Sequence, residues 1–215
     1  MSAPEPTIQI VDDDESFLAA ISRLLRASGF AVSTFSSASE LLAACDADAP
    51  GCVLADVQMP GMNGLDLQAA LARTRNPRPI LFLTGHGDIP SSVRAMREGA
   101  VDFLEKRAPK EHLLDAVKRA LARDARDRAE RTRLRELRAR FDLLTARELE
   151  VLSHVVRGRL NKQIAADLGI HERTVKLHRT AVTTKLGVQS VAELTQLSLE
   201  GGIFTAPSSP FPKGL

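Results

Sequence analysis

The first 105 residues alternate between short apolar runs and longer segments with helical periodicity. Runs rich in β-branched and aromatic residues predict strands, whereas an apolar spacing of three and four predicts helices. Five strand–helix units at this spacing predict an α/β fold with a doubly wound parallel sheet and helices on both faces. The predicted strands are 7–11, 31–35, 52–55, 80–84 and 101–104, and the predicted helices are 15–27, 38–44, 65–73 and 89–97.

A fifth helix is predicted to begin near Pro109, because proline suits the first helical turn. The segment that follows is rich in Arg, Ala and Leu, which are good helix formers, and we interpret 118–140 as a helical linker. Its charges are typical of a solvated helix. A helix that dimerises or transmits a signal is the alternative, because a short apolar seam with spacings of three and four is formed by Leu134, Leu137 and Phe141.

The chain therefore divides into a first domain at 5–117, the linker at 118–140, an all-helical second domain at 141–204 and a flexible Gly/Pro/Ser-rich tail at 205–215. Charge follows this division. Residues 1–117 carry 10 Lys or Arg against 16 Asp or Glu, the linker carries 10 against 4, and residues 141–215 carry 9 against 7. An acidic front and a basic middle indicate modules with different partners.

Composition excludes several classes of protein. The 215 residues are 44% hydrophobic and 26% charged, which is typical of a soluble protein. No apolar stretch approaches the length of about 18 residues that spans a membrane, and the N-terminus lacks the basic region of a signal peptide, so we expect a cytoplasmic protein without membrane contact. Cys45 and Cys52 lack metal-ligand spacing, and we expect both to be reduced, buried thiols.

Polar or charged side chains that could bind a ligand or take part in a reaction follow four of the predicted strands. In an open parallel sheet, the carboxyl ends of the strands meet along one rim, where ligands bind. Taken alone, the acidic residues suit a helix cap or a turn, Asp14 in particular suits an N-cap, and Thr84 suits a strand end. The residues that this topology brings to one rim are Asp12, Asp13, Asp14, Asp56, Thr84 and Lys106.

Together these groups suit transfer of a phosphoryl group to a carboxylate. Packed carboxylates repel one another, and Mg²⁺, which prefers oxygen ligands, relieves that repulsion. A carboxylate beside Mg²⁺ is a nucleophile for phosphorus, while an ammonium and a hydroxyl stabilise the charged phosphoryl oxygens. We therefore predict that Asp56 accepts the phosphoryl group, that Asp12 and Asp13 bind Mg²⁺, and that Thr84 and Lys106 contact the phosphoryl oxygens.

The segments "IVDDDES", "LADVQMPGMNGL", "LFLTGHGD" and "GAVDFLEK" resemble the receiver domain of two-component response regulators, over about residues 5–122. The resemblance implies a CheY-like fold in which Asp56 accepts phosphate from a sensor histidine kinase. It also implies that Mg²⁺ is held directly by Asp13, Asp56 and the backbone carbonyl of Gln58, with Asp12 acting through water.

The same resemblance assigns residues that surround the phosphate. Phe103 matches the switch aromatic, which turns inward when Thr84 moves toward the phosphate. Gln58 and His86 stand where receivers tune the lifetime of the phosphate. One departure is Arg107, which follows Lys106 where the family usually has a proline after a cis bond. A cis bond before a non-proline residue costs about 2.5–4 kcal/mol, so either that cost is tolerated or the loop that carries Lys106 is rearranged.

Residues 160–187 predict two helices joined by a tight turn. Asn161 would cap the first helix, Gly169 would end it, and the second would run from about Glu172 to Leu186. The outward face of the second helix carries Lys176, His178, Arg179, Thr180 and Lys185. A helix of this kind fits the major groove of DNA, although a small bundle with a solvated basic face would show the same pattern.

The segments "LTARELEVLSHVVRG", "NKQIAADLGI", "TVKLHR" and "KLGVQSVAEL" resemble the LuxR-type helix-turn-helix over about residues 143–200. By that resemblance, the residues that face base edges are Lys176, Leu177 and Thr180. The residues nearer phosphates are Asn161, Lys162, Thr174, Arg179 and Lys185. Helix 190–200 would be the dimer contact on DNA.

Receiver, linker and output domain together resemble the NarL/FixJ class of response regulators, and the FixJ branch most closely. The implied function is a transcriptional regulator and not an enzyme. Phosphorylation of Asp56 would control its dimerisation on double-stranded DNA and its action with RNA polymerase. Two alternatives stay open: a regulator with a degenerate receiver that ignores phosphorylation, which Arg107 allows, and an aspartyl-phosphate phosphatase, which usually has a second Asp where this chain has Gln58.

Overall fold

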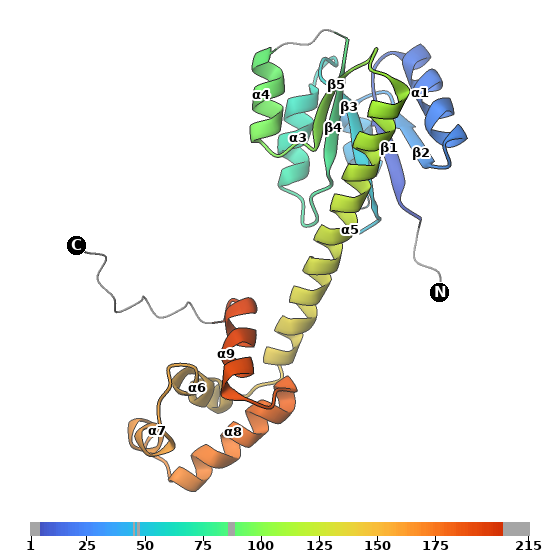
Figure 1. The fold of residues 1–215 in the computed structure, drawn as a ribbon. Helices are drawn as coiled ribbons and strands as arrows, with labels where there is room; N and C mark the ends of the chain where they lie inside the picture. The colour runs from blue at the N-terminus through green and yellow to red at the C-terminus, as the bar shows by residue number, and fades with distance from the viewer. Residues whose placement is uncertain (1–4, 45, 47, 86–88, 204–215) are drawn as a thin grey trace, which may run out of the picture. The chain divides into compact units, whose positions relative to one another are not determined.

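The structure is a computed structural model that describes residues 5–44, 46, 48–85 and 89–203 (Figure 1). The chain forms two compact units, Met1–Ala129 and Glu130–Leu215. The first unit contains β1 (Thr7–Val11), α1 (Glu15–Ala27), β2 (Ala31–Phe35), α2 (Ala38–Ala44), β3 (Gly51–Asp56), α3 (Gly64–Ala72), β4 (Ile80–Thr84), α4 (Ile89–Arg97), β5 (Asp102–Glu105) and the start of α5 (Lys110–Phe141). The second unit contains the end of α5, then α6 (Ala146–Val155), α7 (Asn161–Leu168), α8 (Glu172–Leu186) and α9 (Val191–Glu200).

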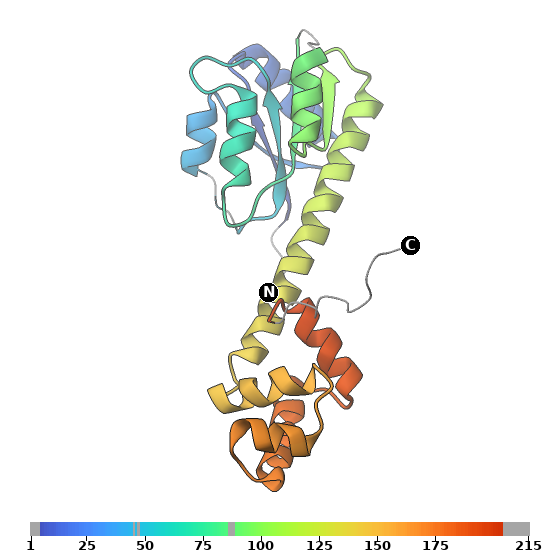
Figure 2. The same cartoon turned by 90° about the vertical axis from the view of Figure 1, so that its left-hand side faces the viewer.

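The first unit is built on one parallel sheet in the strand order β2-β1-β3-β4-β5. Strands β3 and β4 are buried along their whole length, as their unbroken apolar runs predict. Helices α1 and α5 pack on one face through one apolar cluster, and α2, α3 and α4 cover the other face through a second cluster (Figures 1 and 2). The predicted doubly wound α/β fold is confirmed.

Local sequence signals account for most element boundaries. Asp14 caps α1, because its side chain accepts hydrogen bonds from the backbone N–H groups of Ser16 and Phe17. Asn63 caps α3 in the same way through the Asp66 N–H, so this helix begins at Gly64, one residue earlier than predicted. Strand β5 lies one residue later than predicted.

Helix α5 is continuous over 32 residues, and its two ends belong to different units. In the first unit, the buried Asp124 carboxylate accepts a hydrogen bond of 2.9 Å from the Gly51 N–H. In the second unit, Leu137 and Phe141 are buried in the core of the helical domain. Two of the three residues in the apolar seam of the predicted linker are thus used within their own domain.

The second unit packs α6 to α9 around a core that includes Val175, Val182 and Leu186 of α8. Gly169 ends α7 with a φ of 64°, in the left-handed region that glycine adopts at low cost. The prediction that Asn161 caps α7 is wrong. The cap is Leu160, which offers no side-chain acceptor, and its own N–H donates to the Gln163 side chain.

Candidate functional site

The carboxyl ends of the strands bring the predicted acidic residues to one rim of the sheet. Asp12 directly follows β1, Asp56 ends β3, Thr84 ends β4 and Lys106 directly follows β5. Strand register places these ends beside one another, since Asp56 pairs with Leu83 and the residue before it pairs with the last residue of β1. Four strands therefore deliver their polar side chains to one place.

Carboxylate oxygens of Asp12, Asp13 and Asp56 lie within 4.8 Å of one another. Asp12 and Asp56 are buried, with exposed fractions of 1% and 7%, whereas Asp13 is exposed. One oxygen of each buried carboxylate accepts a backbone N–H: Asp12 from Asp14 at 3.0 Å and Asp56 from Val57 at 2.8 Å. The other oxygen of each carboxylate faces Lys106.

The Lys106 ammonium lies between the two buried carboxylates. Its Nζ atom is 2.6 Å from Asp12 Oδ2 and 3.4 Å from Asp56 Oδ2. The Lys106 N–H donates to the Thr84 carbonyl at 2.8 Å, which fixes the backbone at this point. No cis peptide bond occurs among the described residues, so the Lys106–Arg107 bond is trans. Lys106 therefore reaches the acidic site with Arg107 in place of the usual proline.

The charges in this site act on one another. Burial raises the pKa of the Asp56 carboxyl, and the Asp12 charge raises it further, against the opposing effect of Lys106. Burial works to lower the pKa of Lys106, but the hydrogen bond to Asp12 and the charges of Asp56 and Asp12 outweigh it, and the pKa is raised. Three carboxylates with one ammonium leave an excess of negative charge, which a divalent cation would relieve.

Mg²⁺ fits this donor set, because hard carboxylate oxygens from separate segments converge and one of the three carboxylates is open to solvent. Gln58, whose carbonyl is the further predicted ligand, is exposed beside them. An open groove of about 540 Å³ adjoins the site, and its lining includes Asp13, Gln58, Met59 and Ser91.

The two predicted switch residues occupy neighbouring strands. Thr84 is buried, with an exposed fraction of 2%. Phe103 is half-buried, and the centroid of its ring lies 6.0 Å from that of Phe82. His86 lies outside the described residues.

The second candidate surface is the outward face of α8. Lys176, Leu177 and Thr180 are all exposed, and Leu177 keeps 64% of its surface although it is apolar. Among the residues expected near phosphates, Lys162 is exposed. Half-buried positions hold Asn161, Thr174 and Arg179.

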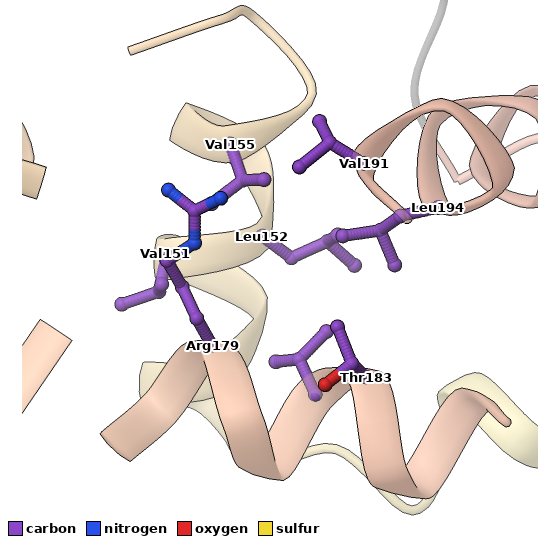
Figure 3. Close-up of a pocket in the computed structure, with 8 residues that line it drawn as sticks. Val151, Leu152, Val155, Arg179, Thr183, Val191 and Leu194 are labelled. Atoms are coloured by element: carbon purple, nitrogen blue, oxygen red, sulfur yellow. The ribbon is translucent and has the colours of Figure 1, made fainter. Parts of the chain in front are cut away.

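Arg179 connects the two helices of this surface. Its Nη1 donates to Asn161 Oδ1 at 2.7 Å, and this bond joins the start of α7 to the middle of α8. The side chain also extends toward α6 at the edge of a small apolar cavity of about 20 Å³ (Figure 3). The cavity is lined by Val151, Leu152, Val155, Arg179, Val182, Thr183, Val191 and Leu194.

Lys185, also expected near phosphate, is bound inside the domain. Its Nζ lies 2.7 and 3.0 Å from the two carboxylate oxygens of the buried Glu148, and 3.2 Å from the Leu143 carbonyl. An ammonium has three N–H donors, so these acceptors use all of them. These contacts tie the end of α8 to α6 and to the segment before it.

Comparison with known families identifies both units. Residues 8–118 match the response regulator receiver domain, and residues 142–198 match the bacterial regulatory proteins of the luxR family. The chain belongs to the response regulators with a LuxR-type DNA-binding domain. Receivers of this family generally use Mg²⁺ at an acidic pocket, and the pocket of this response regulator has the matching cluster of aspartates.

Several relatives resemble this response regulator over nearly its whole length. The response regulator protein TodT of Pseudomonas putida is 43% identical over 198 residues, which cover 92% of this chain and 87% of TodT. Nodulation protein W of Bradyrhizobium diazoefficiens is 43% identical over 90% of this chain and 86% of its own. The transcriptional regulatory protein FixJ of Azorhizobium caulinodans is 38% identical over 93% of this chain and 94% of FixJ.

Solved structures agree with the family. The response regulator StyR is 44% identical, with a TM-score of 0.81 over 91% of this chain and 99% of its own. Full-length FixJ from B. japonicum is 34% identical, with a TM-score of 0.57 over 94% of this chain and 100% of the FixJ chain. Within the part of this response regulator that the structure describes, no helix is long and apolar enough to cross a membrane.

Sequence reasoning missed two contacts in these sites. Phe17 places its ring 4.5 Å from the Lys106 ammonium. Glu148 binds the side chain of Lys185. Both contacts depend on the direction of a long lysine side chain, which no local spacing determines. The sequence did hold one signal for the second contact: Glu148 lies three and four residues before Val151 and Leu152, on the apolar face of α6. A carboxylate on such a face is expected to need a cationic partner.

Proposed function

We propose that this response regulator accepts a phosphoryl group on Asp56 from a sensor histidine kinase, and that the phosphorylated protein dimerises on DNA to control transcription. The observation that carries the proposal is the arrangement around Asp56. A buried carboxylate ends a central strand, Lys106 approaches it to 3.4 Å, and two further carboxylates lie within 4.8 Å. This is the chemistry that phosphoryl transfer to a carboxylate requires.

In the transfer, an oxygen of the Asp56 carboxylate bonds to phosphorus while the bond from phosphorus to the donor nitrogen breaks. Lys106 then turns its ammonium toward the phosphoryl oxygens, and the Thr84 hydroxyl follows. Asp13, Asp56 and the carbonyl of Gln58 would hold Mg²⁺, with Asp12 acting through water. When bound, Mg²⁺ would neutralise part of the phosphoryl charge.

Switching follows from the movement of Thr84. As its hydroxyl turns toward the phosphate, Phe103 moves inward against Phe82. Helix α4 beside them exposes the apolar side chains of Ile89, Val93 and Met96, which we propose as part of the dimer face. The phosphate need supply only a few kcal/mol of bias to shift such an equilibrium.

The output domain would then bind a two-fold DNA site. The face of α8 that carries Lys176, Leu177 and Thr180 is exposed and suits the major groove. Phosphate contacts are proposed for Asn161, Lys162, Thr174 and Arg179, and α9 is the proposed dimer contact on DNA. Because the proposed partners are double-stranded DNA and RNA polymerase, we propose that the protein acts in the bacterial cytoplasm, as a regulator and not as an enzyme.

The two alternatives have less support. A degenerate receiver would follow if Arg107 displaced Lys106 from the site, but Lys106 contacts both buried carboxylates. An aspartyl-phosphate phosphatase would need a general acid two residues after Asp56, and Gln58 cannot supply one.

The test combines Mg²⁺, a small phosphodonor such as acetyl phosphate, and two readouts, intact mass and oligomeric state. We expect one added phosphoryl group and a shift from monomer to dimer, with neither in Asp56→Asn. Phosphorylation without dimerisation would support relief of inhibition in place of dimerisation. An unmodified wild-type protein would favour the regulator that ignores phosphorylation.

A further inference from the structure

Lys106 contacts an aromatic ring in addition to the two carboxylates. Its Nζ lies over the Phe17 ring, 4.5 Å from the centroid, on the side of the site formed by α1. A cation within about 6 Å of a ring centroid is attracted by the negative face of the π-system. Both side chains are half-buried, so solvent only partly screens this attraction.

The start of α1 holds the Phe17 ring in place. The Phe17 N–H donates to the carboxylate of the N-cap Asp14 at 3.1 Å. The ring also packs against the apolar cluster between α1 and the sheet. The acidic run that supplies Asp12 and Asp13 therefore continues directly into the helical turn that presents the ring, so the ring and the carboxylates lie on one continuous, capped segment.

Besides its ion pairs with Asp12 and Asp56, the loop that carries Lys106 restrains this residue through backbone hydrogen bonds. The Lys106 N–H binds the Thr84 carbonyl and the Ala108 N–H binds the Glu105 carbonyl, while Arg107 supplies no proline ring. A lysine side chain loses substantial rotamer freedom when it is fixed in one position. The Phe17 ring is neutral, unlike the carboxylates of Asp12 and Asp56, so it attracts the ammonium without competing with the phosphoryl group for a proton or a metal.

We propose that Phe17 is a positioning residue for phosphorylation of Asp56: its ring holds the Lys106 ammonium beside the phosphoacceptor. The inference rests on the proposed function of Asp56 and Lys106. Loss of a partly desolvated cation–π contact corresponds to a rate constant of phosphorylation that is about 3- to 20-fold lower.

The experiment measures the rate constant of Asp56 phosphorylation by acetyl phosphate with Mg²⁺ in the full chain. We expect Phe17→Leu, which keeps an apolar side chain, to be slower by that factor and Phe17→Tyr to restore most of the rate. Phenylalanine carrying one, two or three ring fluorines at position 17 should lower the logarithm of the rate constant stepwise, because fluorine weakens the negative face and hardly changes shape. The matched control is Phe30→Leu, which alters a half-buried ring in the same cluster.

A second readout reports on the contact itself. In the wild-type protein, NMR should find the ε-methylene protons of Lys106 shifted upfield by the ring, and Phe17→Leu should remove that shift. In a Lys106→Met background, Phe17→Leu should cause no further loss of rate. A rate that is unchanged in Phe17→Leu, or insensitive to fluorination, would overturn the proposal.

The proton shift also separates two kinds of failure. Unshifted Lys106 protons in the wild-type protein would overturn the contact. Shifted protons in a wild-type protein that acetyl phosphate does not modify would instead overturn the proposed function of Asp56.

Discussion

Replacing Lys185 should destabilise the DNA-binding domain and leave the salt dependence of DNA binding unchanged. The Lys185 ammonium donates to both oxygens of Glu148 and to the Leu143 carbonyl. Lys185→Met keeps the apolar stem and removes these three bonds, and it leaves the carboxylate of Glu148 buried at an exposed fraction of 6%.

The magnitude follows from burial. Breaking a fully buried ion pair costs about 3–5 kcal/mol, and a hydrogen bond to a charged group contributes about 1.5–3 kcal/mol. Because 34% of the Lys185 side chain is exposed, we expect about 2–3 kcal/mol for Lys185→Met. In a domain of this size, that corresponds to a fall of about 8–24 °C in Tm.

The assay is denaturant unfolding of the full chain, with peptide-level hydrogen exchange used to follow α6 to α8. Glu148→Gln is the partner variant, because it keeps the acceptor for the Thr145 N–H and removes the charge. A double-mutant cycle of the two changes should give a coupling of at least about 1 kcal/mol.

The ion pair also predicts a pH dependence. The hydrogen bond from Lys185, followed by that from the Thr145 N–H, holds the pKa of Glu148 below its ordinary value of 4.5. The unfolded chain therefore takes up this proton first, and stability is lost as the pH falls below the ordinary pKa and through the lowered one. Glu148→Gln should flatten this part of the pH profile.

DNA binding provides the refutation. Each lost phosphate contact should reduce the slope of log K against log salt concentration by about 0.9 on a duplex of mixed sequence. Lys162→Met is the matched control. Lys162 is exposed and forms no ion pair within the described part of the chain, so its loss should change the slope and not the stability. If Lys185→Met changes the slope and leaves stability intact, Lys185 contacts phosphate and our reasoning is wrong.

Three further predictions concern single positions. Leu160→Ser should stabilise the DNA-binding domain by about 1 kcal/mol, because serine supplies the side-chain acceptor that the N-cap of α7 lacks. Hydrogen exchange of α7 should slow, and a Leu160→Ala variant that is protected as well as Leu160→Ser would contradict this explanation. Burial, with a smaller effect of Asp124, raises the pKa of the Cys52 thiol to about 12. In a Cys45→Ser background, iodoacetamide should therefore modify Cys52 only on unfolding, and stability should fall as the pH rises above the ordinary thiol pKa of about 8.5, a trend that Cys52→Ala should weaken. Gly51→Ala should cost at least about 3 kcal/mol, because φ is 147° and a Cβ would meet the Thr7 carbonyl oxygen at 2.0 Å, and an unfolding midpoint like the wild type's would refute the argument.

Much of the receiver could be predicted because two simple regularities determine it. Unbroken apolar runs mark the central strands, and parallel pairing brings their carboxyl ends together, so the sequence alone places Asp12, Asp56 and Thr84 at one rim. Helix starts with a local acceptor, such as Asp14, were equally accessible.

Contacts made by long side chains were not accessible in this way. The face of α8 that carries Lys185 looks polar in sequence, yet its flexible stem reaches the buried Glu148, 37 residues earlier. Asn161 is a good capping residue, but it is the first residue of α7, and the N-cap position is held by Leu160, whose N–H donates to the Gln163 side chain. The position of Lys106 over Phe17 combines two segments that only the folded sheet brings together.

The bond between Asp124 and Gly51 determines where the receiver can be cut. The family match ends at residue 118, but the carboxylate that satisfies the buried Gly51 N–H lies six residues further along α5, and the Arg128 side chain binds the Asp48 carbonyl one turn beyond it. A fragment that stops at 118 would leave that N–H unpaired, at a cost of about 1–3 kcal/mol. A fragment that ends at 129 retains both bonds, so we expect a stable receiver fragment to extend beyond the residues that match the family.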